Sequence, residues 1–213
     1  LLLHRDKPGG GIATFPDKAL LAWEALPVCT TAQHKPAAVF LDRDGTLMED
    51  VGFLADPDGI QVFDDTVSAL LRLQERFVLF VITNQSGVGD GLIRLEDAHR
   101  VNAELDRRLA QEGIRIREWY VCPHAKKDEC ACRKPKPEFV LKAARDYGID
   151  LQRSYSIGDH PHDAELGKSL GVTGLYVLTG HGTKHREELP PDTPVFPGIG
   201  EATTWILRHD SWL

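Results

Sequence analysis

Long hydrophobic runs and an excess of positive charge are both missing from this sequence of 213 residues. No apolar stretch approaches the ~18 residues that span a membrane, so no transmembrane helix is predicted. The opening Leu-Leu-Leu is interrupted at His4, so it does not predict a signal peptide. The net charge is −7, whereas general nucleic-acid binders are usually basic, so nucleic acid is not an expected partner.

Cysteine is scarce and unevenly placed. Three of the four cysteines fall within eleven residues of one another and beside a histidine, whereas Cys29 lies far from them. Clustered thiols next to a histidine favour metal binding in a reducing cytoplasm over a pair of disulfides. We therefore expect a cytoplasmic protein in which Cys29 is a plain thiol.

The rest of the chain has the pattern of one α/β domain. Residues 1–35 are irregular apart from one helical pattern near 18–26, and are expected to form an N-terminal extension. Over residues 36–213 short apolar runs alternate with helical patterns, which predicts a parallel sheet flanked by helices, with ligands at the carboxyl ends of its strands. The expected strands are 37–41, 77–82, 119–121, 155–157 and 175–178. The expected helices begin after Asp65, which is the expected N-cap, near Leu95 and at Pro137.

Two aspartates follow the first expected strand. Asp42 and Asp44 are two residues apart, so in an extended backbone both carboxylates can face one ligand. One can attack phosphorus and form an acyl phosphate, and the other can protonate the leaving oxygen and then activate water. The Asp-x-Asp-Gly pattern also fits an ordinary turn, whereas an EF-hand calcium loop would need further ligands and a later Glu.

A donor-rich segment follows the second expected strand. Thr83 is the expected direct phosphate contact, and Asn84, Gln85 and Ser86 offer further donors beside two glycines. Such a segment on its own also fits a polar loop. Because it follows a strand end, as the acid pair does, we interpret the two together as one phosphate site.

A compact Cys/His segment comes next. Its four candidate ligands are Cys122, His124, Cys130 and Cys132. Three thiolates and one imidazole suit tetrahedral Zn²⁺, and four protein ligands close the coordination sphere, so the zinc would be structural. It would order a segment that is too short and polar to order itself by burial. Free thiols or a disulfide are the alternatives.

Two cationic residues follow the last zinc ligand directly. Lys134 can neutralise both the Asp42 carboxylate and an incoming phosphate, and Arg133 can hold a substrate oxygen with its planar donors. Lys136, two residues further on, is expected to be solvated.

A third acid site follows the strand at 155–157. Mg²⁺ takes oxygen ligands and usually one or two carboxylates directly. Asp42 and Asp159 can supply these, with the Asp44 main-chain carbonyl completing the protein ligands. Asp163 would orient a metal-bound water.

Taken together, these motifs resemble the haloacid dehalogenase (HAD) superfamily, and more narrowly its histidinol-phosphatase and heptose-bisphosphate phosphatase subfamily. The matching motifs are 41–46 (LDRDGT), 83–87 (TNQSG), the Cys/His segment with Arg-Lys-Pro, and Gly-Asp at 158–159, within roughly residues 36–188. The resemblance implies a Rossmann-like fold, with Asp42 as nucleophile, Asp44 as acid/base, Thr83 and Lys134 on phosphate, Mg²⁺ on Asp42, Asp44 and Asp159, and Zn²⁺ on Cys122, His124, Cys130 and Cys132. The expected substrate-binding residues are Arg43, Asn84, Gln85, Ser86 and Arg133.

Two further features bear on the substrate contacts and on access to the site. Heptose-bisphosphate phosphatases usually show Lys after the Mg²⁺-binding aspartate, where this chain has His160. We expect His160 and His162 to be polar residues at a helix start and not ligands of a second metal. About 36 residues separate Thr46 from Thr83 and about 50 separate Thr83 from Lys134, too few for a cap domain beside the expected elements. The site is therefore expected to be open.

The expected substrate is D-glycero-D-manno-heptose 1,7-bisphosphate, bound by a monomer or weak oligomer. Histidinol phosphate is the alternative, because the short spacing between His124 and Cys130 is similar to that branch. A nucleic-acid 3′-phosphatase shares the Asp-x-Asp-Gly-Thr and Thr-Asn-Gln motifs but lacks the zinc segment. A non-catalytic binding protein on the same scaffold would show no turnover.

Overall fold

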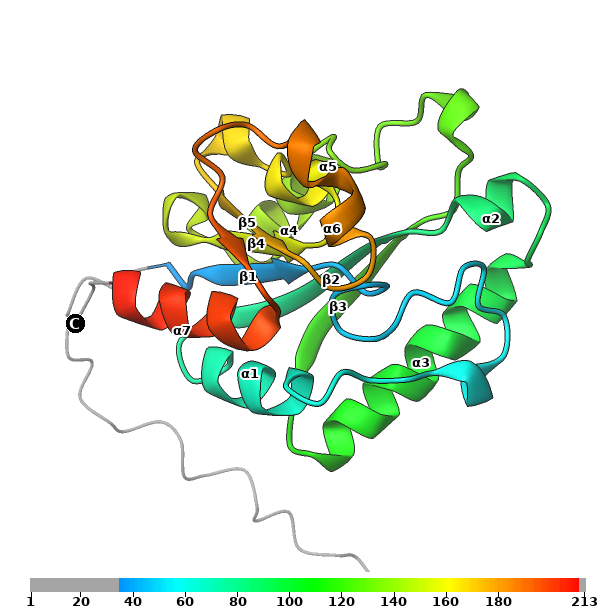
Figure 1. The fold of residues 1–213 in the computed structure, drawn as a ribbon, viewed down its shortest axis with the longest axis horizontal. Helices are drawn as coiled ribbons and strands as arrows, with labels where there is room; N and C mark the ends of the chain where they lie inside the picture. The colour runs from blue at the N-terminus through cyan, green and yellow to red at the C-terminus, as the bar shows by residue number, and fades with distance from the viewer. Residues whose placement is uncertain (1–34, 211–213) are drawn as a thin grey trace, which may run out of the picture. The chain divides into compact units, whose positions relative to one another are not determined.

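The computed structural model describes residues 35–210 (Figure 1). Apart from Lys35, the expected N-terminal extension lies outside the described residues, as does Cys29. Six parallel strands form one sheet in the order β3-β2-β1-β4-β5-β6. The strands are β1 Ala38–Leu41, β2 Val78–Asn84, β3 Ile116–Cys122, β4 Tyr155–Gly158, β5 Thr173–Val177 and β6 Val195–Phe196.

Helices connect successive strands, as parallel pairing requires. The α-helices are α1 Thr66–Leu73, α2 Ser86–Gly89, α3 Leu95–Gln111, α4 Glu138–Tyr147, α5 Pro161–Ala164, α6 Gly182–His185 and α7 Ile199–His209. Single 3₁₀ turns occur at Pro57–Gly59, Lys126–Asp128, Leu151–Arg153, Lys168–Leu170 and Arg186–Glu188.

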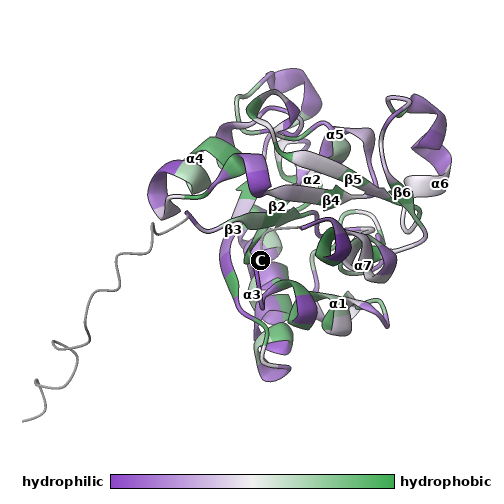
Figure 2. Cartoon of the chain, turned by 90° about the vertical axis from the view of Figure 1, so that its left-hand side faces the viewer, coloured by the Kyte–Doolittle hydropathy of each residue, from purple (hydrophilic) through white to green (hydrophobic). Residues whose placement is uncertain are grey.

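The sheet is covered on both faces. Helices α1, α3 and α7 lie below it in Figure 1, and α4 and α5 lie above it. A hydrophobic core lies on each face of the sheet. Alternate residues of strand β1 belong to one core or the other, because successive side chains point to opposite faces. Val39 and Leu41 pack in the cluster that includes residues of α1, α3 and α7, whereas Ala38 and Phe40 pack in the cluster that includes residues of α4. This explains why β1 is a continuous apolar run. Helix α4, in contrast, carries both hydrophobic and hydrophilic residues in Figure 2, as expected of a helix with one face on the sheet.

The α/β fold class and all five expected strands are confirmed, with ends shifted by up to three residues. Thr83 and Asn84 belong to the end of β2 and not to a loop. Strand β6 and helix α7 were not predicted. The strand has two residues, which is too short for a periodic signal, but Ile199, Ala202 and Ile206 follow helical spacing and are buried.

Asp65 stands at the expected N-cap position of α1, yet its side chain does not cap that helix. Its Oδ2 atom accepts a hydrogen bond from the backbone N–H of Gly200, in the first turn of α7, at 2.9 Å. The two helices pack side by side, so the acceptor that the sequence assigns to one helix serves the neighbouring one.

Neither connection that could carry a cap domain does so. Residues 42–77 contribute one 3₁₀ turn and α1, and residues 85–134 contribute α2, α3, β3 and the Cys/His segment. Within 35–210, no helix combines the length and the apolar character needed to cross a membrane. Among the described residues, then, no cap domain lies in either connection that borders the carboxyl edge of the sheet.

Candidate active site

The acid pair lies where β1 ends. The backbone N–H of Asp42 donates to Ile157 O of β4 at 2.9 Å, which fixes this residue at the centre of the sheet. The Asp42 Oδ1 atom accepts from the backbone N–H of Arg43 at 2.8 Å and pairs with Lys134 Nζ at 2.6 Å. Burial raises the pKa of Asp42 to about 6, although the Lys134 ammonium opposes this shift. The carboxylate is thus oriented and partly neutralised by a buried cation.

Asp44 is held from behind by Arg43. The Nε and Nη2 atoms of Arg43 donate to the Asp44 carboxylate at 3.0–3.2 Å, and Gln85 Nε2 donates to Asp44 Oδ2 at 2.8 Å. Arg43 is fully buried, and its Nη1 atom donates to Asn102 of α3 at 2.6 Å. This placement departs from the expected substrate contact, because the Arg43 side chain is fully buried and its donors bind Asp44 and Asn102.

The donor-rich segment at the end of β2 lies beside the acid pair. Thr83 is almost fully buried, and its Oγ1 atom accepts from Gln85 Nε2 at 2.8 Å. Asn84 accepts from the backbone N–H of Lys134 at 3.1 Å and so ties β2 to the segment after β3. Ser86 begins α2 and lines the same cavity as these three residues.

Lys134 joins two aspartates from different strand ends. Its Nζ atom lies 2.6 Å from Asp42 Oδ1 and 2.6 Å from Asp163 Oδ1, and donates to Ile82 O at 2.7 Å. Burial alone would lower the pKa of Lys134, but Asp163 and Asp42 raise it above its ordinary value. The lysine is therefore charged, and its charge is shared between the two carboxylates.

Three carboxylates converge into a candidate metal centre. One oxygen from each of Asp42, Asp159 and Asp163 lies within 4.8 Å of the others. Burial, Asp42 and Asp163 together raise the pKa of Asp159 to about 8, so the cluster is short of positive charge even with Lys134 present. A hard divalent cation fits these oxygen donors and would supply the missing charge. Asp163, expected to orient a water, lies in this donor set and pairs with Lys134. The Asp44 carbonyl as a ligand stays a prediction.

Two glycines allow the chain to close around Asp159. Gly45 and Gly180 have φ angles of +77° and +52°, and a Cβ atom on either would collide with the Asp159 carboxylate. The backbone N–H of His181 donates to Asp159 Oδ2 at 2.7 Å. The loops after β1 and β5 therefore hold Asp159 from two sides, in conformations that favour glycine.

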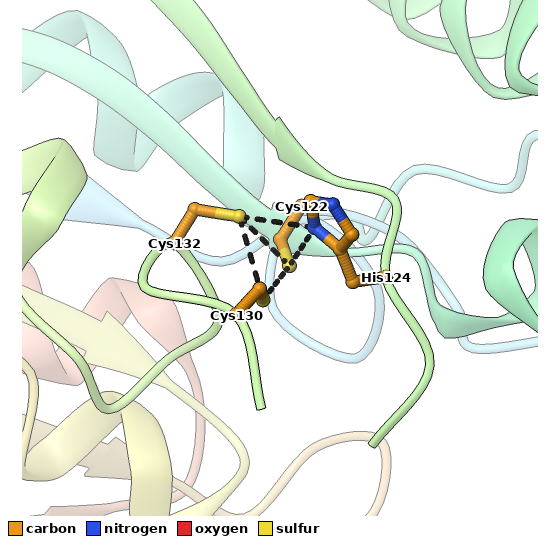
Figure 3. Close-up of side chains that lie close together, drawn as sticks. All are labelled: Cys122, His124, Cys130 and Cys132. Atoms are coloured by element: carbon orange, nitrogen blue, oxygen red, sulfur yellow. Dashed lines mark hydrogen bonds between the residues drawn. The ribbon is translucent and has the colours of Figure 1, made fainter. Parts of the chain in front are cut away.

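The four candidate zinc ligands come together at the end of β3 (Figure 3). The three sulfur–sulfur distances are 3.3, 3.5 and 3.6 Å, and His124 Nδ1 lies 3.3 Å from Cys132 Sγ and 3.8 Å from Cys122 Sγ. A tetrahedral ion with Zn–S bonds of about 2.3 Å would separate its sulfur ligands by about 3.8 Å, so the set fits Zn²⁺ with slight expansion. Burial raises the pKa of the Cys122 and Cys132 thiols, which a bound cation would reverse.

The Cys/His segment is fastened to the residues that follow it. Arg133 Nη1 donates to His124 O at 3.4 Å. Lys136 Nζ donates to Glu129 O at 2.8 Å and to Cys130 O at 2.6 Å, so its ammonium binds the segment and is not simply solvated, as was expected. A metal in the Cys/His set would thereby fix the start of the segment that carries Lys134.

The candidate catalytic and phosphate-binding residues meet at one cavity of about 520 Å³. The acid pair, Thr83, Asn84, Gln85, Ser86, Arg133, Lys134, Asp159 and Asp163 line it. Arg43, in contrast, is absent from its walls.

Comparison with known proteins agrees with this geometry. The HAD-hydrolase-like family matches residues 131–202. The D-glycero-beta-D-manno-heptose-1,7-bisphosphate 7-phosphatase of Bordetella bronchiseptica is 32% identical over 175 residues, which are 80% of this chain and 98% of that protein. The chain belongs to the HAD-like hydrolases.

Two further likenesses place this HAD-like hydrolase among phosphatases. A probable D-glycero-D-manno-heptose-1,7-bisphosphate 7-phosphatase of Thermoplasma acidophilum is 36% identical over 63% of this chain and 85% of its own length. The crystal structure of the D,D-heptose 1,7-bisphosphate phosphatase of B. bronchiseptica, complexed with magnesium and phosphate, superposes with a TM-score of 0.74 at 31% identity, over 81% of this chain and 98% of that one. The chain is therefore a phosphoric monoester hydrolase.

Sequence reasoning did not find one wall of the phosphatase cavity. His160, His162, His181 and His185 line it, with ring centroids 4.4 Å apart for the first pair. The expectation that His160 starts a helix is confirmed, because its side chain accepts from the backbone N–H of His162 at the start of α5. His181 and His185 belong to the loop and short helix after β5, and the position of His181 shortly after the expected strand 175–178 is a sequence signal that could have found it.

Proposed function

We propose that this chain is a Mg²⁺-dependent phosphatase that removes a phosphate from D-glycero-D-manno-heptose 1,7-bisphosphate through an aspartyl-phosphate on Asp42. The observation that carries the proposal is the Asp42 carboxylate, held by Lys134 at 2.6 Å beside a second, separately positioned carboxylate in one cavity. The heptose substrate is supported by the names of the relatives, which share about a third of their residues with this chain.

In the first step, Asp42 attacks phosphorus, and the bond from phosphorus to the sugar oxygen breaks. The proton on Asp44 passes to that oxygen, so the sugar leaves as an alcohol and not as an alkoxide. Lys134 lies against Asp42 and is placed to offset the charge that the nucleophile and the phosphate bring together. Thr83 and Ser86 line the cavity and supply hydroxyl donors for phosphate oxygens.

In the second step, Asp44 takes a proton from water, and that water attacks the phosphorus of the aspartyl-phosphate. Inorganic phosphate leaves and Asp42 is restored. Asp42 and Asp159 would hold Mg²⁺, with Asp163 beside them. When bound, the ion supplies positive charge that lowers the cost of bringing a phosphate dianion to several carboxylates.

The Cys/His set is proposed as a structural zinc site. Its four side chains would complete the tetrahedral coordination of Zn²⁺ and would leave no open position for substrate or water. Its role here would be to hold Arg133 and Lys134 at the cavity. We further infer that the enzyme acts in the cytoplasm, as a monomer or weak oligomer, on a small phosphorylated molecule.

The test is phosphate release in the presence of Mg²⁺. Both anomers of the heptose bisphosphate, histidinol phosphate and a DNA 3′-phosphate would be offered in parallel, with Asp42→Asn as the blank. A preference for one heptose anomer of at least tenfold over the other three is expected. Preference for histidinol phosphate would keep the mechanism and replace the substrate, whereas a lack of turnover on all four would refute the proposed substrate class.

A further inference from the structure

A buried hydrogen bond links helix α3 to the acid pair. Arg43 Nη1 donates to Asn102 Oδ1 at 2.6 Å, while Nε and Nη2 of the same guanidinium donate to Asp44. Arg43 is 0% exposed and Asn102 is 4% exposed, so water cannot take the place of either partner. The contact spans 59 residues of sequence and lies on the side of Asp44 away from the cavity.

In this contact Asn102 offers Arg43 a single, uncharged hydrogen-bond acceptor. The amide oxygen of Asn102 is used, whereas its Nδ2 atom has no hydrogen-bond partner in the described structure. A carboxylate at this position would compete with Asp44 for the charge of Arg43. An apolar side chain would leave a buried guanidinium N–H unpaired, which is costly enough to make the guanidinium rotate toward another acceptor.

Because the guanidinium is rigid and planar, its rotation would also disturb the contacts with Asp44. Because Nη1 and the Nε–Nη2 edge belong to one plane, turning Nη1 away from Asn102 moves both donors that bind Asp44. Gln85 Nε2 would still hold Asp44 Oδ2 at 2.8 Å, so the carboxylate would be displaced and not released.

We propose that Asn102 is a positioning residue for acid/base catalysis, which acts through Arg43 to aim the Asp44 carboxylate at the leaving-group oxygen. The inference rests on the proposed function, since it takes Asp44 as the acid/base. It assigns α3 a part in the chemistry beyond its packing against the sheet.

The effect should depend on the leaving group. A sugar alkoxide is a poor leaving group and needs the proton of Asp44, whereas p-nitrophenolate leaves readily without one. A misaimed Asp44 should therefore slow transfer from a sugar phosphate and leave transfer from p-nitrophenyl phosphate nearly unchanged. General acid–base catalysis contributes about 10²–10⁴-fold in rate, and since Gln85 keeps part of the alignment we expect a loss of about tenfold.

The experiment compares Asn102→Leu with the wild-type holoenzyme. Single-turnover rates of leaving-group release would be measured with enzyme in excess, for heptose bisphosphate and for p-nitrophenyl phosphate, which isolates the first step from the hydrolysis that follows. We expect the ratio of the two rates to fall about tenfold in Asn102→Leu and further in Asp44→Asn. Val101→Ala is the matched control, because Val101 is the fully buried neighbour on α3 and should lower stability without changing the ratio.

Equal loss on both substrates in Asn102→Leu, as in the control, would overturn the positioning role. A crystal structure of Asn102→Leu gives an independent reading that does not need turnover. In that structure, Nε and Nη2 of Arg43 should no longer both donate to Asp44. If both donors still bound Asp44, the inference would be refuted even if the enzyme proves to act on another substrate. If the wild type turned over neither substrate, that result would contradict the proposed function and not the positioning role of Asn102.

Discussion

Replacement of Lys134 by methionine is the sharpest perturbation that the site offers. The lysine is 3% exposed and its Nζ atom lies 2.6 Å from both Asp42 and Asp163. Methionine keeps most of the length and apolar volume of the side chain and removes its charge. The variant would therefore leave the Asp42 and Asp163 carboxylates, which are 13% and 3% exposed, without their shared cation.

The magnitude follows from this geometry. Removing one partner of a buried ion pair costs about 3–5 kcal/mol, because the remaining charge stays desolvated. For a domain of this size each kcal/mol shifts Tm by about 2–4 °C, so the Tm of Lys134→Met should fall by about 6–20 °C. Turnover should be lost as well, since the lysine touches the proposed nucleophile.

The deficit should depend on pH in metal-free buffer. Burial already raises the folded-state pKa of Asp42 to about 6, and Lys134 opposes that shift. Without the lysine this pKa rises further above its unfolded value, so the folded variant gains stability as it takes up protons. The Tm difference from wild type should therefore be largest near pH 8 and shrink as the pH falls toward about 6, because below that pH Asp42 becomes protonated in both folded forms.

The assay is thermal unfolding across that pH range, with Lys136→Met as the control. Lys136 carries the same charge two residues away, but its ammonium is exposed and binds two carbonyls and no carboxylate. Its replacement should cost less than about 1 kcal/mol. A Lys134→Met variant that unfolds within 2 °C of this control at pH 8 would refute the reasoning.

Three further outcomes are expected. Asp42→Asn should abolish phosphate release while circular dichroism and Tm report an intact fold, and residual activity within tenfold of wild type would exclude a covalent role. Cys130→Ser should lower both Tm and the zinc content measured by elemental analysis, because it removes one of four ligands that order the segment before Lys134. An unchanged Tm would refute the structural role of the zinc. Gly180→Ala should reduce activity at least tenfold at saturating Mg²⁺, since its Cβ would displace the Asp159 carboxylate, and wild-type kinetics would show that the loop can yield.

Much of the fold was readable because its signals are local. Apolar runs such as Ala38–Leu41 mark strands buried on both faces, and spacings of three and four mark α3. Strand β6 has too few residues for such a signal. The Asp65 carboxylate was assigned to α1, whereas it accepts a hydrogen bond from α7, because both helices begin beside it.

The chemistry was readable for a similar reason. Asp42 and Asp159 each follow a strand and Thr83 lies in the last residues of one, and parallel strands end at one edge, so their convergence needed no knowledge of strand order. The Cys/His segment needed even less, since all four of its residues lie within eleven positions of one another.

Tertiary structure decided which of these side chains pair. Arg43 could have faced substrate or protein, and helix α3, packed below the sheet, offered the buried acceptor that turned it inward. Asp163 pairs with Lys134, which approaches from beyond the Cys/His segment, and its predicted role in orienting a water stays a prediction. Sequence alone determined the inventory of groups and the edge of the sheet where they meet. Their partners depended on contacts between residues far apart in the chain, which no local pattern records.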